Sequence, residues 1–233
     1  MRPGPVQVWV ADLRLDPARR RELERHLAAD ERERAARFHR AADRDRFVAA
    51  RGLLREVLAG RLGVAPGAVS FEPAGEGKPR LAVPDRDLRF NASRSGERAA
   101  FALAVAREVG VDVERVRDDL DVDAVARRAL SAGELRAWLE LPPARRAGAF
   151  FAAWARKEAY AKAWGEGLAL GLDRIETTPS PERPDRLRVL GRGREEEPWE
   201  ACDVDAGPGY AAAVVAEGEG WPLEVGSLGG WRG

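Results

Sequence analysis

The order of periodic segments along this chain is the feature that most constrains its fold. Apolar residues alternate over 6–13, as in a half-buried strand, and helical spacing follows from Pro17 to about residue 29, capped by Asp16. A longer helical pattern over 43–63 ends at a glycine, Gly63. Three strand-like segments then follow, over 87–93, 98–105 and 109–116.

The second part of the chain repeats this mixture. Ser131 and Glu134 have the spacing of a capping box, and a long helix is predicted from about Arg146 to Trp164. Several strands follow, ending in "GYAAAVVAE", which resembles "RAAFALAVA" of the earlier part. The resemblance predicts two similar αβ halves that pack together.

Composition narrows the functions open to such a chain. With 233 residues and 45% hydrophobic content, it is long enough to bury one large core or two smaller ones in contact. Because Lys plus Arg and Asp plus Glu number 39 each, binding to nucleic acid or to an anionic membrane is disfavoured. Cys202 has no partner for a disulfide, His26 and His39 form no zinc motif with it, and no apolar run spans a membrane, so we expect a cytoplasmic protein.

Residue types that are rare in this chain mark a few positions of interest. Arginine supplies nearly all of the basic side chains, and the lysines are Lys78, Lys157 and Lys162. Asn91 is the only asparagine. We expect these places to form one site, although chance alone is the simpler alternative.

A strand with two carboxylates, "VGVDVERV", suggests a metal. Its period of two puts Asp112 and Glu114 on one face and Val111 and Val113 on the other. Oxygen ligands of this kind favour a hard cation such as Mg²⁺ together with substrate phosphates. A solvated strand face is the alternative, and the charged continuation "ERVRDDLDVD" is compatible with it.

The helix "AFFAAWARKEAYAKAWGEGL" adds a third carboxylate and a cation. Glu158 and Lys162 are four residues apart, which places them on one face of the helix. Such a pair is usually a surface ion pair, but this helix is otherwise mostly apolar. Lys78 in the glycine-rich "GEGKPR" and Arg94 in "FNASRSG" supply further cations. Together the segments predict a site for Mg²⁺ and a diphosphate.

These motifs resemble those of the 4′-phosphopantetheinyl transferases, in the long form that includes the surfactin-synthetase-activating enzyme. The resemblance rests on "GKP" (77–79), "FNASRSG" (90–96), "GVDVE" (110–114) and "WARKEAYAKAWGEGL" (154–168), in the family's order and spacing. An upstream helix, "FHRAADRDRFVAARGLLR", is also similar.

The resemblance implies an enzyme that moves the 4′-phosphopantetheine arm of coenzyme A to a serine of a carrier protein and releases adenosine 3′,5′-bisphosphate. It implies Asp112, Glu114 and Glu158 as Mg²⁺ ligands, with Asp112 also in the catalytic set. Glu158 is the candidate base for the carrier serine, directly or through water, and Lys162 would balance charge on the leaving diphosphate. Lys157 belongs to the motif without an assigned role.

The resemblance also implies a set of coenzyme A contacts. The expected contacts are Arg46, Arg51, Lys78, Pro79, Asn91, Ser93, Arg94 and Lys162. Arg46 and Arg51 are the expected contacts of the 3′-phosphate of coenzyme A. Arg40 or Arg44 are alternatives, because this helix aligns only loosely with the family's pattern. Arg94 stands where many relatives have histidine, and since arginine stays charged at any working pH, phosphate binding is expected there without proton transfer.

The implied fold is α+β, a pseudo-dimer of two halves (residues 1–106 and 107–233), each a small sheet packed on a long helix. The second half carries the metal, and the coenzyme lies in the cleft between the halves. By this analogy the protein is a monomer. Its partner is an apo acyl or peptidyl carrier protein of fatty acid, polyketide or nonribosomal peptide synthesis.

Two other classes of function stay open from the sequence. One is a different Mg²⁺-dependent phosphoryl-transfer enzyme, although the P-loop pattern and the glycine-rich dinucleotide pattern are both absent. The other is a non-catalytic coenzyme A-binding or scaffold protein, against which the intact Glu158 argues.

Overall fold

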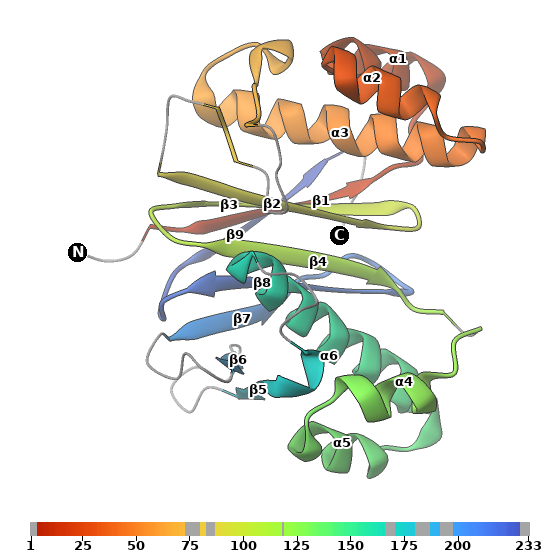
Figure 1. Cartoon of the computed structure of the whole chain (residues 1–233), viewed down its shortest axis with the longest axis vertical. Coiled ribbons are helices and arrows are strands. Elements are labelled where there is room, and N and C mark those ends of the chain that lie inside the picture. Colours follow the sequence, from red (N-terminus) through yellow and green to blue (C-terminus); the bar gives the residue numbers. More distant parts are fainter. Residues whose placement is uncertain are drawn as a thin grey trace.

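A computed structural model describes residues 4–72, 80–82, 87–117, 119–165, 171–179, 187–191 and 198–228 (Figure 1). No helix in these ranges is both long and apolar enough to cross a membrane. The helices are α1 (Pro17–His26), α2 (Ala29–Ala36), α3 (Ala41–Leu62), α4 (Val122–Ala129), α5 (Ala132–Leu139) and α6 (Pro143–Trp164), with 3₁₀ turns η1 (Pro66–Ala68) and η3 (Leu172–Arg174). The strands are β1 (Val6–Asp12), β2 (Leu88–Ser95), β3 (Arg98–Val105), β4 (Val109–Arg115), β5 (Ile175–Pro179), β6 (Leu187–Gly191), β7 (Trp199–Asp203), β8 (Tyr210–Glu217) and β9 (Leu223–Leu228).

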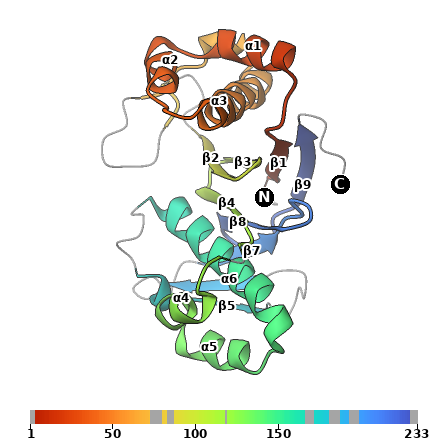
Figure 2. The same cartoon turned by 90° about the vertical axis from the view of Figure 1, so that its right-hand side faces the viewer.

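The strands form two sheets. The first has the order β2-β3-β1-β9 and the second the antiparallel order β4-β8-β7-β6-β5. Strand β9, the last along the chain, pairs in parallel with β1, so sequence-distant ends share one sheet (Figure 2). Sequence periodicity did not predict β9, because its alternation is weak and its place depends on a long-range pairing.

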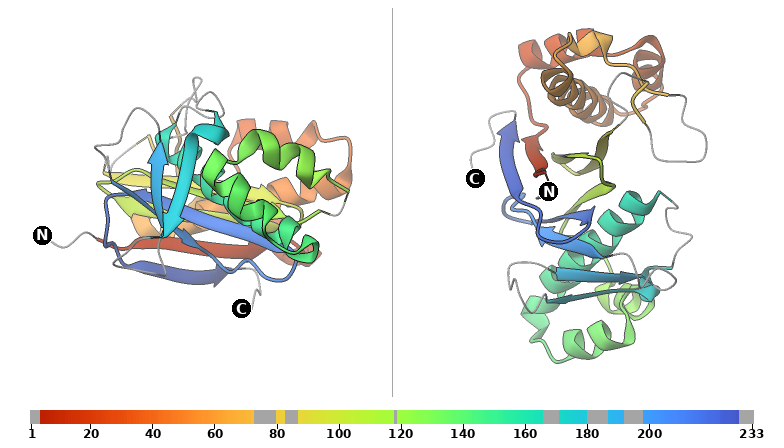
Figure 3. Two further views of the ribbon diagram at one scale, coloured as in Figure 1. Left: turned by 90° about the horizontal axis from the view of Figure 1, so that it is seen from below. Right: turned by 90° about the vertical axis from the view of Figure 1, so that its left-hand side faces the viewer.

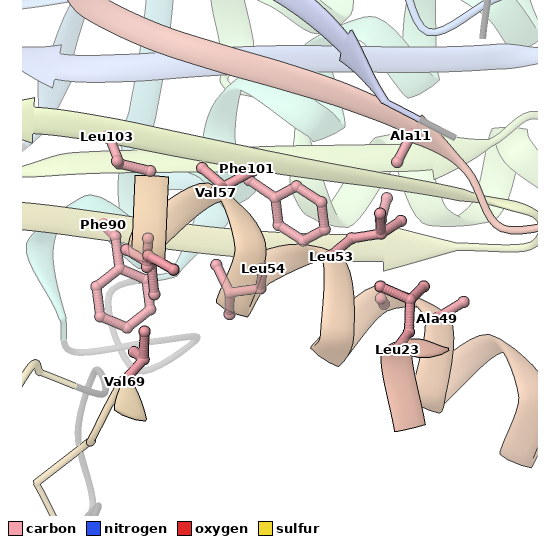
Figure 4. Close-up of a cluster of buried hydrophobic side chains, with 14 of the residues drawn as sticks. Ala11, Leu23, Ala49, Leu53, Leu54, Val57, Val69, Phe90, Phe101 and Leu103 are labelled. Atoms are coloured by element: carbon pink, nitrogen blue, oxygen red, sulfur yellow. The ribbon is translucent and has the colours of Figure 1, made fainter. Parts of the chain in front are cut away.

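Three apolar clusters hold the layers together. One packs α1 and α3 against the outer face of the first sheet, through Leu23, Leu53 and Phe101 among others (Figure 4). A second joins α4, α5 and α6 to the outer face of the second sheet, and a third lies between the two sheets. Helices therefore occupy both ends of the molecule with the sheets between them (Figures 1 and 3). The predicted α+β fold of two similar halves is confirmed.

The helix boundaries follow the expected signals except at the end of α1 and at the start of α6, which begins at Pro143 and not near Arg146. Asp16 accepts hydrogen bonds from the backbone of Ala18 and Arg19, and Gly63 ends α3 with φ of +68°, as predicted. Helix α1, however, ends at His26 and not near residue 29, because Leu27 is extended and a separate helix, α2, begins two residues later.

The packing of α6 on β4 is unusually close. A Cβ built on Gly110 of β4 would lie 1.9 Å from the Ala159 carbonyl oxygen and 2.6 Å from the Ala163 nitrogen, both in the backbone of α6. Atoms cannot approach to such distances, so a side chain here would push the helix off the strand. Glycine at 110 is therefore a requirement of this contact.

We expect Gly110→Ala to lower the free energy of unfolding by about 3 kcal/mol, because backbone atoms must move to admit the methyl group. Gly148→Ala is the matched control: it lies in α6 with nothing within 4 Å of a built Cβ, and should raise stability by up to about 1 kcal/mol. Urea unfolding of the three proteins checks this, and a Gly110 variant as stable as the wild type would contradict the close contact.

Candidate active site

Strand β4 presents two acidic side chains to helix α6. Val111 and Val113 enter the core between the sheets, while Asp112, only 2% exposed, and the half-buried Glu114 alternate with them. The alternation predicted from the sequence is thus confirmed, and both carboxylates lie at the edge of the second sheet.

Helix α6 brings a cation to Asp112. The Lys162 Nζ donates to Asp112 Oδ1 at 2.5 Å and to Ser93 Oγ at 3.0 Å. Within the described ranges its ion-pair partner is this buried aspartate and not Glu158, one turn away on the same helix. Lys162 therefore links α6 to β4 and to β2 of the other half, which an ordinary surface pair would not do.

The three carboxyl groups predicted as metal ligands all have a raised pKa. Burial raises the pKa of Asp112 despite the nearby Lys162, and burial raises the pKa of Glu114 with a smaller contribution from Asp112. The pKa of Glu158 is raised first by burial and then by Asp112 and Glu114. Asp112 Oδ2 and Glu158 Oε1 are buried and have no hydrogen-bond partner in the described part of the chain. The cluster is thus short of positive charge.

Strand β2 meets β4 through side chains and not through a backbone ladder. Ser93 Oγ donates to Asp112 Oδ1 at 2.7 Å, and Ser95 Oγ donates to Glu114 Oε2 at 2.8 Å. The Asn91 Oδ1 accepts from the backbone N–H of Val111 at 3.0 Å. In this structure Asn91, which we predicted as a coenzyme A contact, joins the two sheets.

Arginines from the first half line a cavity of about 250 Å³ next to Ser93. Arg94 is partly exposed to solvent, and its guanidinium lies near Arg34 and Arg46. Partial burial, and after it the like charge of Arg34, lowers the pKa of Arg94. Arg46 pairs with Glu97 and Asp43. The cavity is lined by Arg34, Phe47, Ala50, Arg51, Leu54, Ala92, Ser93, Arg94 and Phe101.

A second cavity, of about 730 Å³, shares Arg34, Phe47 and Arg51 with the first. The Arg51 guanidinium pairs with Glu31 and lies 4.1 Å from the centre of the Phe71 ring. The predicted contacts Lys78 and Pro79 lie outside the described residues. The structure thus brings Asp112, Glu114, Glu158, Lys162 and Ser93 into one cluster. Of the predicted arginines, Arg51 and Arg94 line the adjoining cavities, whereas Arg46 is not among the lining residues.

The chain is similar to known proteins over most of its length. Family profiles match residues 18–106 (4′-phosphopantetheinyl transferase, N-terminal) and 108–215 (4′-phosphopantetheinyl transferase superfamily). The 4′-phosphopantetheinyl transferase HetI of Nostoc sp. is 34% identical over 93% of this chain and 89% of its own length. This chain belongs to the 4′-phosphopantetheinyl transferase superfamily. It is a holo-carrier-protein synthase of the two-domain form, as predicted.

Further relatives of this transferase cover less of the chain. The 4′-phosphopantetheinyl transferase of Bacillus subtilis is 31% identical over 63% of this chain and 64% of its own length. Among solved structures, a holo-(acyl-carrier-protein) synthase of Bacillus anthracis in complex with coenzyme A (3′,5′-ADP) matches with a TM-score of 0.41 at 21% identity, over 47% of this chain and 94% of its own.

Lys157 of the transferase has a structural role that the sequence did not reveal. Its side chain is fully buried, and Nζ donates to the carbonyl oxygens of Ala129, Leu172 and Ile175 at 2.7–2.9 Å. The same ammonium lies 2.5 Å from Glu134 Oε2. Lys157 thereby anchors α6 to α4, α5, η3 and β5 from the residue next to Glu158.

Glu134 completes this anchor. It forms the predicted capping box with Ser131, and its Oε1 accepts from both the backbone and the hydroxyl of Thr177 at 3.0 Å. The signal available in the sequence was the lysine itself, which this arginine-rich chain keeps where a compact ammonium with three donors fits a closed site.

One further group of possible metal ligands lies in the first half. One ligand atom each from Glu22, His26 and Glu56 fall within 4.8 Å of one another in the described part of the chain. Arg19 already donates to Glu22 and Glu56, and His26 lies 3.2 Å from Glu56. This ion-pair network accounts for the group without a metal.

We expect Lys157→Met to lower the free energy of unfolding of the transferase by about 3 kcal/mol or more, since Glu134 and three carbonyl groups lose a buried donor. Arg156→Met, at the neighbouring position, removes only an ion pair with the exposed Asp203, and should cost less than about 1 kcal/mol. Chemical denaturation compares them, and equal losses for both variants would contradict the anchor.

The carboxylate cluster should cost stability when no metal is present. In EDTA at neutral pH we expect Glu158→Gln to raise the free energy of unfolding, because it removes a half-buried negative charge that lies close to Asp112 and Glu114. Because the folded state raises the pKa of Glu158, the wild type is penalised above that pKa. The penalty fades as pH falls toward the ordinary value, where both states are protonated. Thermal melts from pH 4 to 8 test this, and a gain that persists at low pH would exclude the charge as its cause.

Proposed function

We propose that this transferase moves the 4′-phosphopantetheine arm of coenzyme A to a serine of an apo acyl or peptidyl carrier protein, with Mg²⁺, and releases adenosine 3′,5′-bisphosphate. One observation carries the proposal. Buried oxygens of Asp112 and Glu158 lack partners within the described residues, beside a lysine that bridges both halves. A buried cluster with unmatched negative charge is costly unless a cation or a ligand completes it.

The residues present fit a hard divalent cation. Asp112, Glu114 and Glu158 offer carboxylate oxygens alone, which Mg²⁺ prefers, and burial raises the pKa of all three. These three residues would hold the ion. When bound, it would supply positive charge for the diphosphate of the substrate.

The arginine-lined cavities suit the nucleotide end of coenzyme A. Arg34, Arg51 and Arg94 offer guanidinium groups, which bind phosphate by two parallel hydrogen bonds. Phe47 lines both cavities and provides an apolar wall. Since Ser93 lines the smaller cavity and donates to Asp112, phosphates held there would lie next to the carboxylates.

The transfer step uses Glu158 and Lys162 of α6. The serine oxygen of the carrier protein forms a bond to the phosphorus that carries the pantetheine arm, and the bond from this phosphorus to the bisphosphate breaks. Glu158 takes the serine proton, directly or through water. Lys162 stabilises the negative charge that develops on the leaving bisphosphate.

An intact-mass assay tests the proposal. The protein, coenzyme A, Mg²⁺ and an apo carrier protein should yield a carrier heavier by one phosphopantetheine, and Asp112→Asn should not. Binding of coenzyme A without any mass gain, over several unrelated carriers, would favour the alternative of a non-catalytic binding protein. A mass gain of the carrier protein that still occurs in EDTA would contradict the requirement for Mg²⁺.

Lys162 should be hard to replace even by arginine. Its Nζ contacts two oxygens in a crowded site and the side chain is 30% exposed. We expect Lys162→Arg to keep its melting temperature but to lower turnover at least about tenfold, or about 1.4 kcal/mol. Arg156→Lys, the reverse exchange on the same helix, should leave the initial rate unchanged. If Lys162→Arg turned over as fast as the wild type, Lys162 would be an ordinary surface residue with no role at the diphosphate.

A further inference from the structure

We infer that Ser95 is a positioning residue that holds the Glu114 carboxylate ready for the metal, so that the first half of the chain helps to set the metal site of the second. The inference rests on the proposed function, which makes Glu114 a metal ligand. Ser95 itself lies outside the coenzyme contacts and carboxylates assigned above.

The hydrogen bonds of Ser95 fix the direction of its hydroxyl group. Ser95 Oγ accepts the backbone N–H of Arg115 at 3.1 Å and donates to Glu114 Oε2 at 2.8 Å. A serine hydroxyl has one hydrogen to donate, and here it goes to the carboxylate. Across the described residues, Ser95 is the only hydrogen-bond donor to the Glu114 side chain, so it alone selects which oxygen is occupied.

The same serine–carboxylate contact occurs two residues earlier on both strands. Ser93 and Ser95 are two residues apart on β2, and Asp112 and Glu114 are two residues apart on β4. Because side chains on a strand repeat every two residues, each serine reaches one carboxylate. The match in register supports a shared role. In each acidic side chain, one carboxylate oxygen accepts a hydrogen bond from a serine, and the other oxygen makes no hydrogen bond with that serine.

The turn after Ser95 is held in place. Gly96 has φ of +54°, and a Cβ there would lie 2.7 Å from the Tyr210 hydroxyl. That hydroxyl accepts the backbone N–H of Glu97 at 3.0 Å. Tyr210 lies on β8, the neighbour of β4, so the turn that carries Ser95 is fixed to the sheet that carries Glu114. Ser95 is therefore preorganised before any ligand binds.

A group that orients a metal-binding side chain affects metal affinity more than it affects folding. If Ser95 served only to join the sheets, its bond to the Arg115 backbone would suffice and the loss of the hydroxyl would lower stability alone. If Ser95 positions Glu114, the loss of its hydroxyl should lower the affinity for the metal ion and leave the binding of coenzyme A in metal-free buffer unchanged. These two roles can be separated by experiment.

The experiment is a Mn²⁺ titration of the whole protein, followed by electron paramagnetic resonance, with and without coenzyme A. We expect Ser95→Ala to bind Mn²⁺ about tenfold more weakly, and Ser95→Thr, which keeps the hydroxyl, to restore binding. In a Glu114→Ala background, Ser95→Ala should cause no further loss. Ser227→Ala, an exposed serine on β9, is the control and should bind as the wild type does.

The outcomes separate this inference from the proposed function. Weaker Mn²⁺ binding in Glu114→Ala but not in Ser95→Ala would overturn the role of Ser95 and leave the metal site standing. A lower melting temperature of Ser95→Ala with unchanged Mn²⁺ affinity would likewise show a structural role only. Failure of the wild type to bind Mn²⁺ in either condition would overturn the metal assignment, and the Ser95 inference with it.

Discussion

The contact between α6 and β4 governs the rest of the candidate active site. Gly110 lets the helix backbone approach the strand to a distance that any side chain would prevent. Because of this approach, the lysine ammonium of Lys162 reaches Asp112, and Glu158 comes close enough for its pKa to respond to the charge of Asp112. A small displacement of the helix would separate these groups, so the chemistry depends on one glycine that takes no part in it.

Such a site is unfavourable for folding, and the structure compensates nearby. Three carboxyl groups with raised pKa lie together, two of them with buried oxygens that have no partner among the described residues. On another face of α6, Lys157 satisfies its three donors on carbonyl groups and pairs with Glu134. The same helix thus carries a strained polar cluster on one face and a fully satisfied one on another. The second holds the helix in place against the repulsion within the first.

Local signals in the sequence predicted much of this molecule. Strand alternation placed Asp112 and Val111 on opposite faces, and the glycine at 63 marked the end of α3. The sequence did not predict the contacts between segments that are far apart along the chain. Sequence spacing could not show that β9 pairs with β1, or that Lys157 would meet carbonyls of three other elements. These features depend on tertiary packing, which a periodic pattern does not encode.

The junction of the two sheets explains why both halves contribute residues to the candidate active site. Strands β2 and β4 are edge strands that face each other, and exposed edges carry unpaired backbone groups. Asn91 and Ser95 accept backbone N–H groups of β4, while Ser93 and Ser95 donate to its carboxylates. The polar side chains that protect the edge therefore also orient the acidic groups. The carboxylate cluster therefore lies along the junction of the two sheets, because polar edge residues of both halves face one another there.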